Sequence, residues 1–342
     1  MGQTVAERFP LRVGGVSVSS PVWLAPLAGI TTETFRWFHR AIGAGLVHTE
    51  MVSVMGLSYR NRKTARMLGE EAEPGPLVLQ LFGPDAESMV RGAELALGIR
   101  CFDALEVNMA CPMPKVAKKG SGAALLLRPE TAREMVTGLK RFDVPVWVKL
   151  RITDPARHPL PTADFCALLL DAGADLLMLH GRTPAQRYEG TADKDAVCGI
   201  AGRFPGLLVA SGDVYAPEDA VFYLERGCVA VLAARGTLRD AFLIPRTLAA
   251  LGYSVEQSLL EPETTARIDA MLAVARHGLL REGESPTLVL LRRMLPGLFR
   301  GFSGASAIRQ ACSACREWPA LEETLLRMRG AIGREGRIVL GE

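Results

Sequence analysis

The segment DAGADLLMLHGRT (residues 171–183) contains a helix end, a glycine turn, a buried strand and a polar strand end, in that order. Gly173 follows a helical pattern, and glycine is the residue that most often lets a helix end and the chain reverse. Residues 176–179 are continuously apolar, which is typical of a parallel strand covered on both faces. The segment therefore predicts one strand–helix unit of an α/β fold, with polar groups at the carboxyl end of its strand.

The same unit recurs along the chain. Strands are predicted at 22–28, 45–50, 76–83, 103–109, 144–150, 174–181, 206–213 and 228–236. Helices fit between them, for example at 32–42, 85–97, 129–140, 163–172 and 217–226. Eight such units predict a (β/α)₈ TIM barrel over residues 1–250. A doubly wound sheet is the alternative, because periodicity does not show whether a sheet closes.

Residues 251–342 form a different region, predicted to be a smaller all-helical domain. Helical patterns occur at 264–278, 287–300 and 321–330, and a strand fragment is possible at 337–340. No repeat of solenoid length is present in the sequence.

Composition limits the class of protein. With 49% apolar and 23% charged residues among 342, the chain is expected to bury a core. A net charge of +3 is too small to imply a nucleic-acid partner by itself. The odd number of cysteines, seven, suggests reduced thiols. We find no signal peptide and no apolar run near the roughly 20 residues that cross a bilayer, so we expect a cytoplasmic monomer without a membrane partner.

Polar residues at the predicted strand ends indicate a site, because function in a barrel lies where the strands end. The glycine turns at 211–213 and 234–236 are typical of a phosphate site, although either alone can be an ordinary turn. Lys149 lies in an apolar strand and needs a partner, either a flavin edge or a structural carboxylate. His180 is interpreted as a site residue rather than a core histidine.

Metal chemistry is not expected from this sequence. The five histidines form no HExxH motif, and Cys312 and Cys315 make a single CxxC in a helical region. We interpret these two cysteines as structural thiols.

The segment EVNMACPMPKVAKKGSG (106–122) follows the fourth strand and places Cys111 at its end. Two prolines stiffen the exit, and Lys115, Lys118 and Lys119 follow without an acidic residue. We expect residues 115–122 to be a mobile cationic flap that the phosphate groups of a ligand draw over the site.

These motifs together resemble the tRNA-dihydrouridine synthase (Dus) family. The resemblance rests on APLAGIT (25–31), TEMVS (49–53), QLFG (80–83), EVNMACPMPKV (106–116), VKLR (148–151), HGRT (180–183), SGD (211–213) and ARG (234–236). Dihydroorotate dehydrogenase, another FMN barrel, is not expected to combine CPxxKV, HGRT and a helical tail. The resemblance implies an FMN enzyme that reduces uridine in tRNA to 5,6-dihydrouridine with NADPH.

The resemblance also implies roles for individual residues. Flavin N5 would deliver hydride to C6 of uracil, and Cys111 would protonate C5. Residues implied to bind FMN are Pro26, Leu27, Ala28, Gln80, Lys149, His180, Ser211, Gly212, Asp213, Ala234 and Arg235. Asn108 and Arg182 would contact the base or nearby phosphate.

The sequence departs from the family pattern at three places. Many members have Asn at the position of Ser211 and Gly at that of Ala234. Serine can still donate and accept a hydrogen bond, but with a shorter reach, and alanine costs little unless the backbone there needs positive φ. A Lys-His pair common in some members is replaced by Arg292-Arg293, so the target nucleotide is left open.

RNA binding has separate support in the tail. Between residues 286 and 316 there are five arginines (292, 293, 300, 309 and 316) and no acidic residue. Arg293 and Arg300 are seven apart and would share a helix face, so we expect both, with the three lysines of the flap, to contact RNA. The alternatives are a small-molecule flavin oxidoreductase acting on a free pyrimidine, a dihydrouridine synthase for ribosomal RNA, and a non-catalytic RNA-binding protein.

Overall fold

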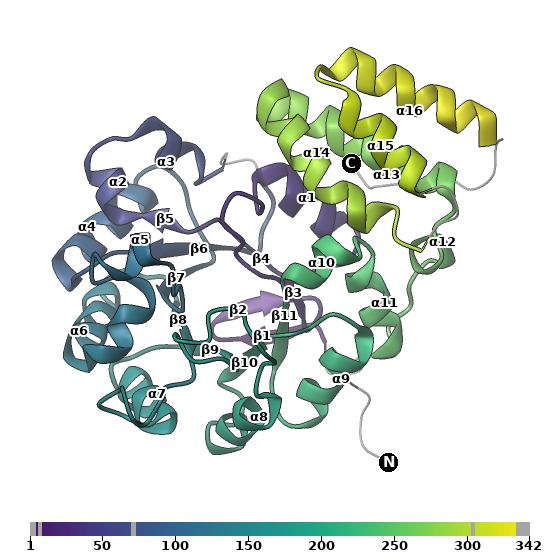
Figure 1. Cartoon of the computed structure of the whole chain (residues 1–342). Helices are drawn as coiled ribbons and strands as arrows, with labels where there is room; N and C mark the ends of the chain where they lie inside the picture. The colour runs from purple at the N-terminus through teal and green to yellow at the C-terminus, as the bar shows by residue number, and fades with distance from the viewer. Residues whose placement is uncertain (1–4, 6–8, 70–72, 302–304, 333–342) are drawn as a thin grey trace.

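The computed structural model describes residues 5, 9–69, 73–301 and 305–332, and its main body is a closed barrel of parallel strands (Figure 1). The barrel strands are β3 (Val22–Leu24), β4 (Val47–His48), β5 (Val52–Ser53), β6 (Leu77–Phe82), β7 (Ala104–Met109), β8 (Val146–Arg151), β9 (Leu176–His180), β10 (Leu208–Ser211) and β11 (Ala230–Ala233). Strand β4 pairs with both β3 and β6, and this closes the ring. The predicted TIM barrel is confirmed; the second predicted strand corresponds to β4, and the short strand β5 that follows it was not predicted.

Helices surround the barrel and follow its strands. The outer helices are α1 (Glu33–Ala41), α4 (Ala86–Leu97), α6 (Pro129–Leu139), α7 (Thr162–Asp171), α8 (Lys194–Arg203), α9 (Pro217–Glu225) and α11 (Leu243–Ala250). Shorter helices lie at the strand ends: α2 (Val54–Ser58), α3 (Arg62–Arg66), α5 (Pro114–Ala117), the 3₁₀ helix Gly122–Leu127 and α10 (Arg235–Arg239). Local signals set some of these boundaries; the Asp85 carboxylate, for example, accepts a hydrogen bond from the Ser88 amide at 2.8 Å at the start of α4.

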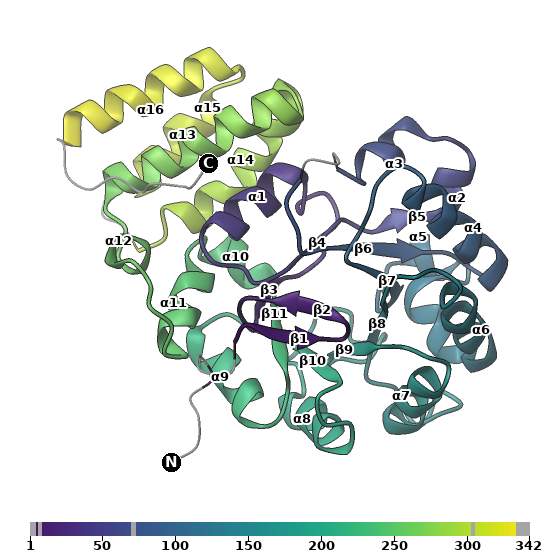
Figure 2. The same cartoon turned by 180° about the vertical axis from the view of Figure 1, so that it is seen from behind.

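A hairpin that the sequence reading missed covers the amino-terminal end of the barrel (Figure 2). Its strands are β1 (Leu11–Val13) and β2 (Val16–Val18), joined by Gly14 and Gly15 with φ of 52° and 88°. Such positive φ values at both turn residues define the tight hairpin turn that glycine favours. A Cβ on Gly14 would lie 2.7 Å from Leu176 Cβ, and Trp147 Nε1 donates to Gly14 O at 2.8 Å. The hairpin therefore closes this end of the barrel.

The barrel interior is apolar at the hairpin end and polar at the other. Trp23 and Trp147 stack there with ring centroids 5.6 Å apart. A second, larger core fills the space between the strands and the outer helices. Toward the carboxyl ends of the strands the inward residues become polar, among them Gln80, Glu106 and Lys149, all buried. The polar end is the mouth of the barrel.

The chain after the barrel is helical, as predicted. It contains α12 (Gln257–Leu260), α13 (Thr264–Arg281), α14 (Glu284–Leu298), α15 (Ala305–Ala314), which was not predicted, and α16 (Trp318–Ile332). The predicted strand at 337–340 lies outside the described residues. In the part of the chain that the structure describes, no helix is both long and apolar enough to cross a membrane.

The prediction that Arg293 and Arg300 share a helix face is wrong, because α14 ends at Leu298. Pro296 interrupts the last turn, and Gly301 follows with a φ of 72°. Proline donates no backbone hydrogen bond, and glycine in the left-handed conformation ends helices. Arg300 therefore leaves the helix in a different direction.

The helical region docks on the barrel through α1 and α10. Arg281 Nε lies 2.7 Å from Glu33 Oε1, and the Glu282 carboxylate accepts the Thr34 amide at 2.7 Å. A Cβ on Gly297 would lie 2.6 Å from Leu238 O, so α14 reaches this distance from α10 only with glycine. These contacts place the helices beside the mouth (Figure 1).

Candidate active site

A cavity of about 350 Å³ opens at the mouth of the barrel. It lies at the carboxyl ends of the strands, where function in this architecture is expected. Of the residues predicted from the sequence, it is lined by Pro26, Leu27, Ala28, Asn108, Cys111, Lys115, Lys149, His180, Ser211, Gly212, Asp213, Ala234 and Arg235. The structure thus brings together residues from six separate segments.

Six predicted site residues do not line this cavity. Gln80 is fully buried below it, and Arg182 is buried beside it. Lys118 and Lys119 are exposed beyond the end of α5. Arg300 lines a larger cavity of about 860 Å³ between the barrel and α13, while Arg293 contacts the loop that follows β3. Tyr215 lines both cavities, but the polar residues at the strand ends line only the smaller one. The smaller cavity is therefore the better candidate for chemistry.

Cys111 is held in place from both sides. Its amide donates to Asn108 Oδ1 at 2.9 Å, and its carbonyl accepts from the Ala123 amide at 2.9 Å. A Cβ on Gly122 would lie 2.7 Å from Cys111 O, so this position, with φ of 63°, requires glycine. Burial raises the pKa of the Cys111 thiol, although Arg151 and Lys149 oppose the shift. The group is therefore a thiol rather than a thiolate near neutral pH.

A chain of buried polar contacts leads from the barrel interior to Cys111. His48 Nε2 lies 3.1 Å from Glu106 Oε2, and the other Glu106 oxygen accepts from Gln80 Nε2. Gln80 Oε1 accepts from Asn108 Nδ2 at 2.9 Å, which leaves Asn108 Oδ1 to accept the amides of residues 110 and 111. The side-chain amides of Gln80 and Asn108 can each make these hydrogen bonds in only one orientation. Gln80 and Glu106 therefore fix the rotamer of Asn108.

Lys149 is a buried cation without a carboxylate within ion-pair distance among the described residues. Its ammonium donates to Ser211 Oγ at 3.3 Å and lines the cavity. Burial lowers the pKa of Lys149 to about 8, with the Glu106 carboxylate opposing the shift. A ligand group with partial negative charge would remove this cost, which favours the flavin-edge interpretation of Lys149.

The part of the cavity around His180 carries positive charge. Burial, with the nearby cations Lys149, Arg151, Arg182 and Arg235, lowers the pKa of His180 to about 2, so the imidazole is neutral. Burial alone raises the pKa of Asp213, but the hydrogen bond from Arg182 lowers it overall. A neutral histidine can donate a hydrogen bond to a hydroxyl group or accept one from it. The nearby cations would bind an anionic group such as a phosphate.

Arg182 and Asp213 form a closed pair. Arg182 Nη2 lies 2.6 Å from Asp213 Oδ2, and Arg235 Nη2 lies 3.2 Å from Asp213 Oδ1. The remaining donors of Arg182 reach the carbonyls of Glu189 and Gly190. Because these partners occupy the donors of Arg182, its contacts do not support the predicted contact with a base or phosphate. Asp213 orients both Arg182 and Arg235.

The segment predicted as a flap contains regular structure. Pro114 begins helix α5, in agreement with the preference of proline for the first helical position. Val116 is buried against Gly122, and the three lysines are exposed, with Lys115 also lining the cavity. Helix α5 covers residues 115–117 of the predicted flap, and residues 118–120 form a turn. Mobility of the segment and its closure over the site stay predictions.

Several cavity residues were not predicted from the sequence, among them Tyr188, Met51 and Met113. Tyr188, 51% exposed, comes from the loop after β9, and Arg151 and Arg235 lie over its ring at 5.5 and 5.0 Å. Met51 and Met113 line the mouth from the ends of β4 and β7. Tyr188 could have been predicted as a cavity residue, because it is an aromatic residue in a loop at a strand end, eight positions after His180. Nothing in the sequence marked the two methionines.

The sequence is similar to proteins named tRNA-dihydrouridine synthases. A probable tRNA-dihydrouridine synthase of Mycobacterium tuberculosis (strain ATCC 25618 / H37Rv) is 31% identical over 339 residues, which cover 94% of this chain and 85% of the relative. The tRNA-dihydrouridine synthase B of Pseudomonas syringae pv. tomato is 33% identical over 265 residues, covering 73% of this chain and 77% of the relative.

The fold is similar to that of solved old yellow enzymes. The homologue from Zymomonas mobilis has a TM-score of 0.54 at 13% identity, over 77% of this chain and 97% of that one. The old yellow enzyme from Trypanosoma cruzi has a TM-score of 0.53 at 11% identity, over 72% and 92%. At such identities the likeness concerns the fold alone.

The sequence profile of the family described as Dihydrouridine synthase (Dus) matches residues 23–328. This range includes the barrel strands, the cavity and most of the helical region, so the match covers far more than one motif. The chain belongs to the dihydrouridine synthase family.

Proposed function

We propose that this protein is an FMN-dependent enzyme that reduces uridines in tRNA to 5,6-dihydrouridine, with NADPH as the reductant. The observation that carries the proposal is the Cys111 thiol, which is kept protonated in the same cavity as Lys149 and His180. An acid, a cation for an electron-rich ring edge and a cationic wall for phosphate are the groups that this reaction requires.

The cavity has features that fit a flavin mononucleotide. Residues 26–28 supply an apolar wall at the end of β3, and Lys149 supplies the cation for the polar ring edge. Ser211, Gly212, His180, Ala234 and Arg235 would hold the ribityl chain and phosphate. A Cβ on Gly212 would lie 2.8 Å from His180 Cδ2, so only glycine permits this backbone path. The bound flavin would supply the hydride for C6 of uracil.

The two departures from the family pattern differ in their local structure. Ala234 has a φ of −117°, so the position does not need a positive φ, but its ψ of −111° lies outside the main allowed regions for alanine. Glycine would adopt this conformation with less strain. Ser211 accepts the hydrogen bond from Lys149, a role that its short hydroxyl can fill, and is compatible with the proposed cofactor.

Cys111 is the proposed general acid for C5 of the base. Its burial keeps the proton on sulfur until an acceptor carbon is close, as a general acid requires. Asn108, fixed by Gln80, holds the backbone of Cys111 through two amide contacts and also lines the cavity where the base would lie. Gln80 acts from below, through Asn108.

The two regions of the chain have different proposed roles. Residues 1–250 would carry the chemistry, and residues 251–342, whose described helices adjoin the mouth, would help to bind RNA. Lys115 lines the cavity, and Lys118 and Lys119 are exposed beside it. These three lysines, Arg300 and the donors of Arg293 that do not bond Gly29 O are the proposed phosphate contacts.

The decisive experiment maps dihydrouridine in cellular RNA with and without the gene. Loss of the modification at one or more tRNA uridines is expected, together with flavin absorbance of the purified protein. Unchanged dihydrouridine at every site would exclude the proposal. Loss only in ribosomal RNA would keep the chemistry and change the substrate.

A further inference from the structure

Helices α2 and α3 form a compact corner (residues 54–66) directly after Met51, which lines the cavity. The Asn61 amide donates to Gly56 O at 3.0 Å, and the Asn61 side chain caps α3 by accepting the amides of Lys63 and Thr64. A Cβ on Gly56 would lie 2.5 Å from Thr64 Oγ1, so the two helices approach this closely only at glycine. Arg60 turns the chain with a φ of 51°, which is rare for arginine.

The corner presents one exposed aromatic ring and four exposed cations. Tyr59 is 76% exposed, and the cations are Arg60, Arg62, Lys63 and Arg66. The sequence has no acidic residue between Val52 and Gly69. Among the ion pairs of the described residues, none involves these four cations, whereas solvated helix faces usually alternate both signs.

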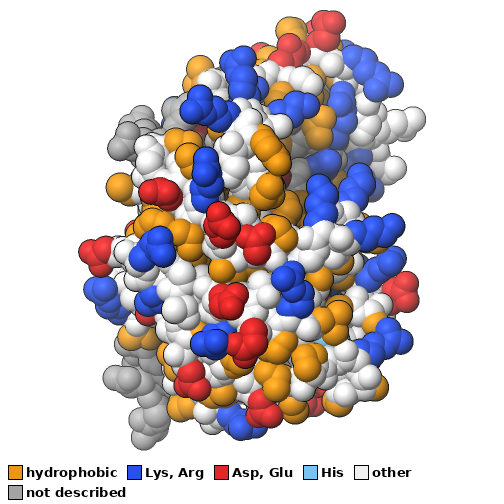
Figure 3. Space-filling model, turned by 90° about the vertical axis from the view of Figure 1, so that its left-hand side faces the viewer, with side chains coloured by type: hydrophobic (Ala, Val, Ile, Leu, Met, Phe, Trp, Pro, Cys, Tyr) orange, Lys and Arg blue, Asp and Glu red, His pale blue; other side chains and the backbone are white. Residues whose placement is uncertain are grey.

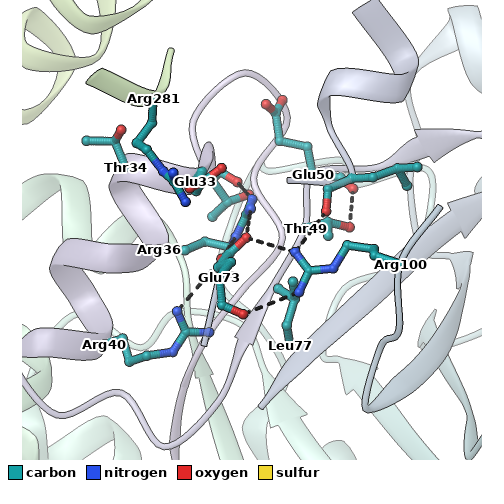
Figure 4. Close-up of polar contacts among 12 residues, drawn as sticks. Glu33, Thr34, Arg36, Arg40, Thr49, Glu50, Glu73, Leu77, Arg100 and Arg281 are labelled. Carbon is teal, nitrogen blue, oxygen red and sulfur yellow. Dashed lines mark hydrogen bonds and ion pairs between the residues drawn. The ribbon is translucent and has the colours of Figure 1, made fainter. Parts of the chain in front are cut away.

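The base of the corner is fixed by a buried ion network (Figure 4). Glu73 lies 2.6 Å from Arg36 Nη2, 3.6 Å from Arg100 Nη1 and 3.7 Å from Arg40 Nη1. Arg100 also donates to the carbonyls of Leu68 and Glu73, on both sides of Gly69. The network ties the chain after α3 to α1, so the corner projects from a rigid support.

The corner lies near helix α5 at the mouth (Figures 1 and 2). Basic side chains gather along the right-hand edge of the space-filling view, toward the mouth (Figure 3). The helical region borders the mouth on the other side (Figure 1). A polynucleotide that reaches the cavity therefore has one exposed cationic surface next to its path.

We propose that the α2–α3 corner is an RNA-docking surface, in which the four cations contact phosphates and Tyr59 stacks on an unpaired base. The inference rests on the proposed function and adds a binding surface to it. Cations without carboxylate partners supply the salt-dependent part of RNA binding, and an exposed aromatic ring is the common platform for single-stranded bases. An apolar or acidic protein partner would not need both features.

The charge test compares two triple variants of the full-length, flavin-loaded enzyme. One is Arg60→Gln, Arg62→Gln and Lys63→Gln; the control is Arg141→Gln, Arg203→Gln and Arg226→Gln, three exposed arginines near the carboxyl ends of α6, α8 and α9. The measurement is the Kd for unmodified tRNA across a salt series. The corner variant should bind about 10–100-fold more weakly, and its slope of log K against log salt should fall by about 2.

Equal losses in both triple variants, or unchanged affinity in the corner variant, would overturn the proposal; the second result would leave a protein partner as the remaining use of this surface. If the wild type forms dihydrouridine but the corner variant keeps its tRNA affinity, only this inference fails. If the wild type modifies no RNA, the proposed function itself fails.

A second pair of variants tests stacking without changing charge. Tyr59→Ala should weaken tRNA binding about 5–100-fold, while Tyr59→Phe keeps the ring and should bind within about twofold of the wild type. Equal affinity of the Ala and Phe variants would exclude the stacking role. Flavin content and NADPH oxidation should stay unchanged in both.

Discussion

Two basic regions of this chain look alike in sequence and differ in structure. In the corner the cations at 60, 62, 63 and 66 are exposed, and none forms an ion pair among the described residues. In the helical region Arg292 Nη2 donates to Cys315 O at 2.9 Å, and Arg293 donates to Gly29 O. Two of the arginines that the sequence offered for RNA therefore hold the protein together.

The difference shows that the number of cations in a segment does not give the number free to bind phosphate. The guanidinium group has five donors and bonds any carbonyl that the fold brings near. In the corner, the short turn at Arg60 points its side chains away from such acceptors. Four experiments, from the largest expected effect to the smallest, test this contrast and the chemistry between the two regions.

Replacing Cys111 with alanine should separate chemistry from RNA binding at both basic regions. Loss of the general acid is expected to slow dihydrouridine formation about 10²–10⁴-fold, with flavin content and tRNA affinity unchanged. Single-turnover product formation is the measurement, and Cys101→Ala, at an exposed cysteine, is the control. A fall in tRNA affinity as large as the fall in rate would contradict the proton-donor role.

Replacing Glu73 with glutamine should weaken the support of the corner. Arg36 and Arg100 would lose the carboxylate that they share in a buried site, which typically costs about 3–5 kcal/mol. Urea unfolding measures the change, and Glu87→Gln, at an exposed residue of α4, is the control. A loss below about 1 kcal/mol would mean that the network does not anchor the segment.

The buried Lys149 should make stability depend on pH. Its folded pKa of about 8 is below the usual 10.5, so between these values the unfolded chain binds more protons and stability rises with pH. Relative to Lys149→Met, the wild type without flavin should gain up to about 3 kcal/mol across this window and show a constant difference below pH 8. Parallel stability curves for the two proteins would show that burial does not shift this lysine.

Arg292 and Arg66 allow the contrast to be tested directly. Arg292→Ala leaves the Cys315 carbonyl without its donor and should cost about 1–2 kcal/mol of stability, with a small effect on tRNA affinity. Arg66→Gln should change stability by less than about 0.5 kcal/mol and lower the salt slope by about 0.7. The reverse pattern would show that the helical region, and not the corner, carries the free cations.

Much of the architecture was readable from local patterns. Predicted outer helices such as 85–97 and 129–140 match α4 and α6 within one residue, because caps and prolines mark their ends. The β1–β2 hairpin was missed, since three-residue strands give too short an alternation to recognise. Cys111, Lys149 and His180 were found because polar residues at the ends of apolar strands meet at one edge.

By itself the sequence determined the barrel, its helical tail and the segments that line the mouth, because apolar periodicity and turn residues act over a few neighbours. Only the tertiary structure decided which polar groups are free. Gln80 is used below Asn108, Arg182 pairs with Asp213, and Arg293 bonds the loop after β3. Those partners lie between 28 and 264 residues away along the chain, where no local pattern reaches.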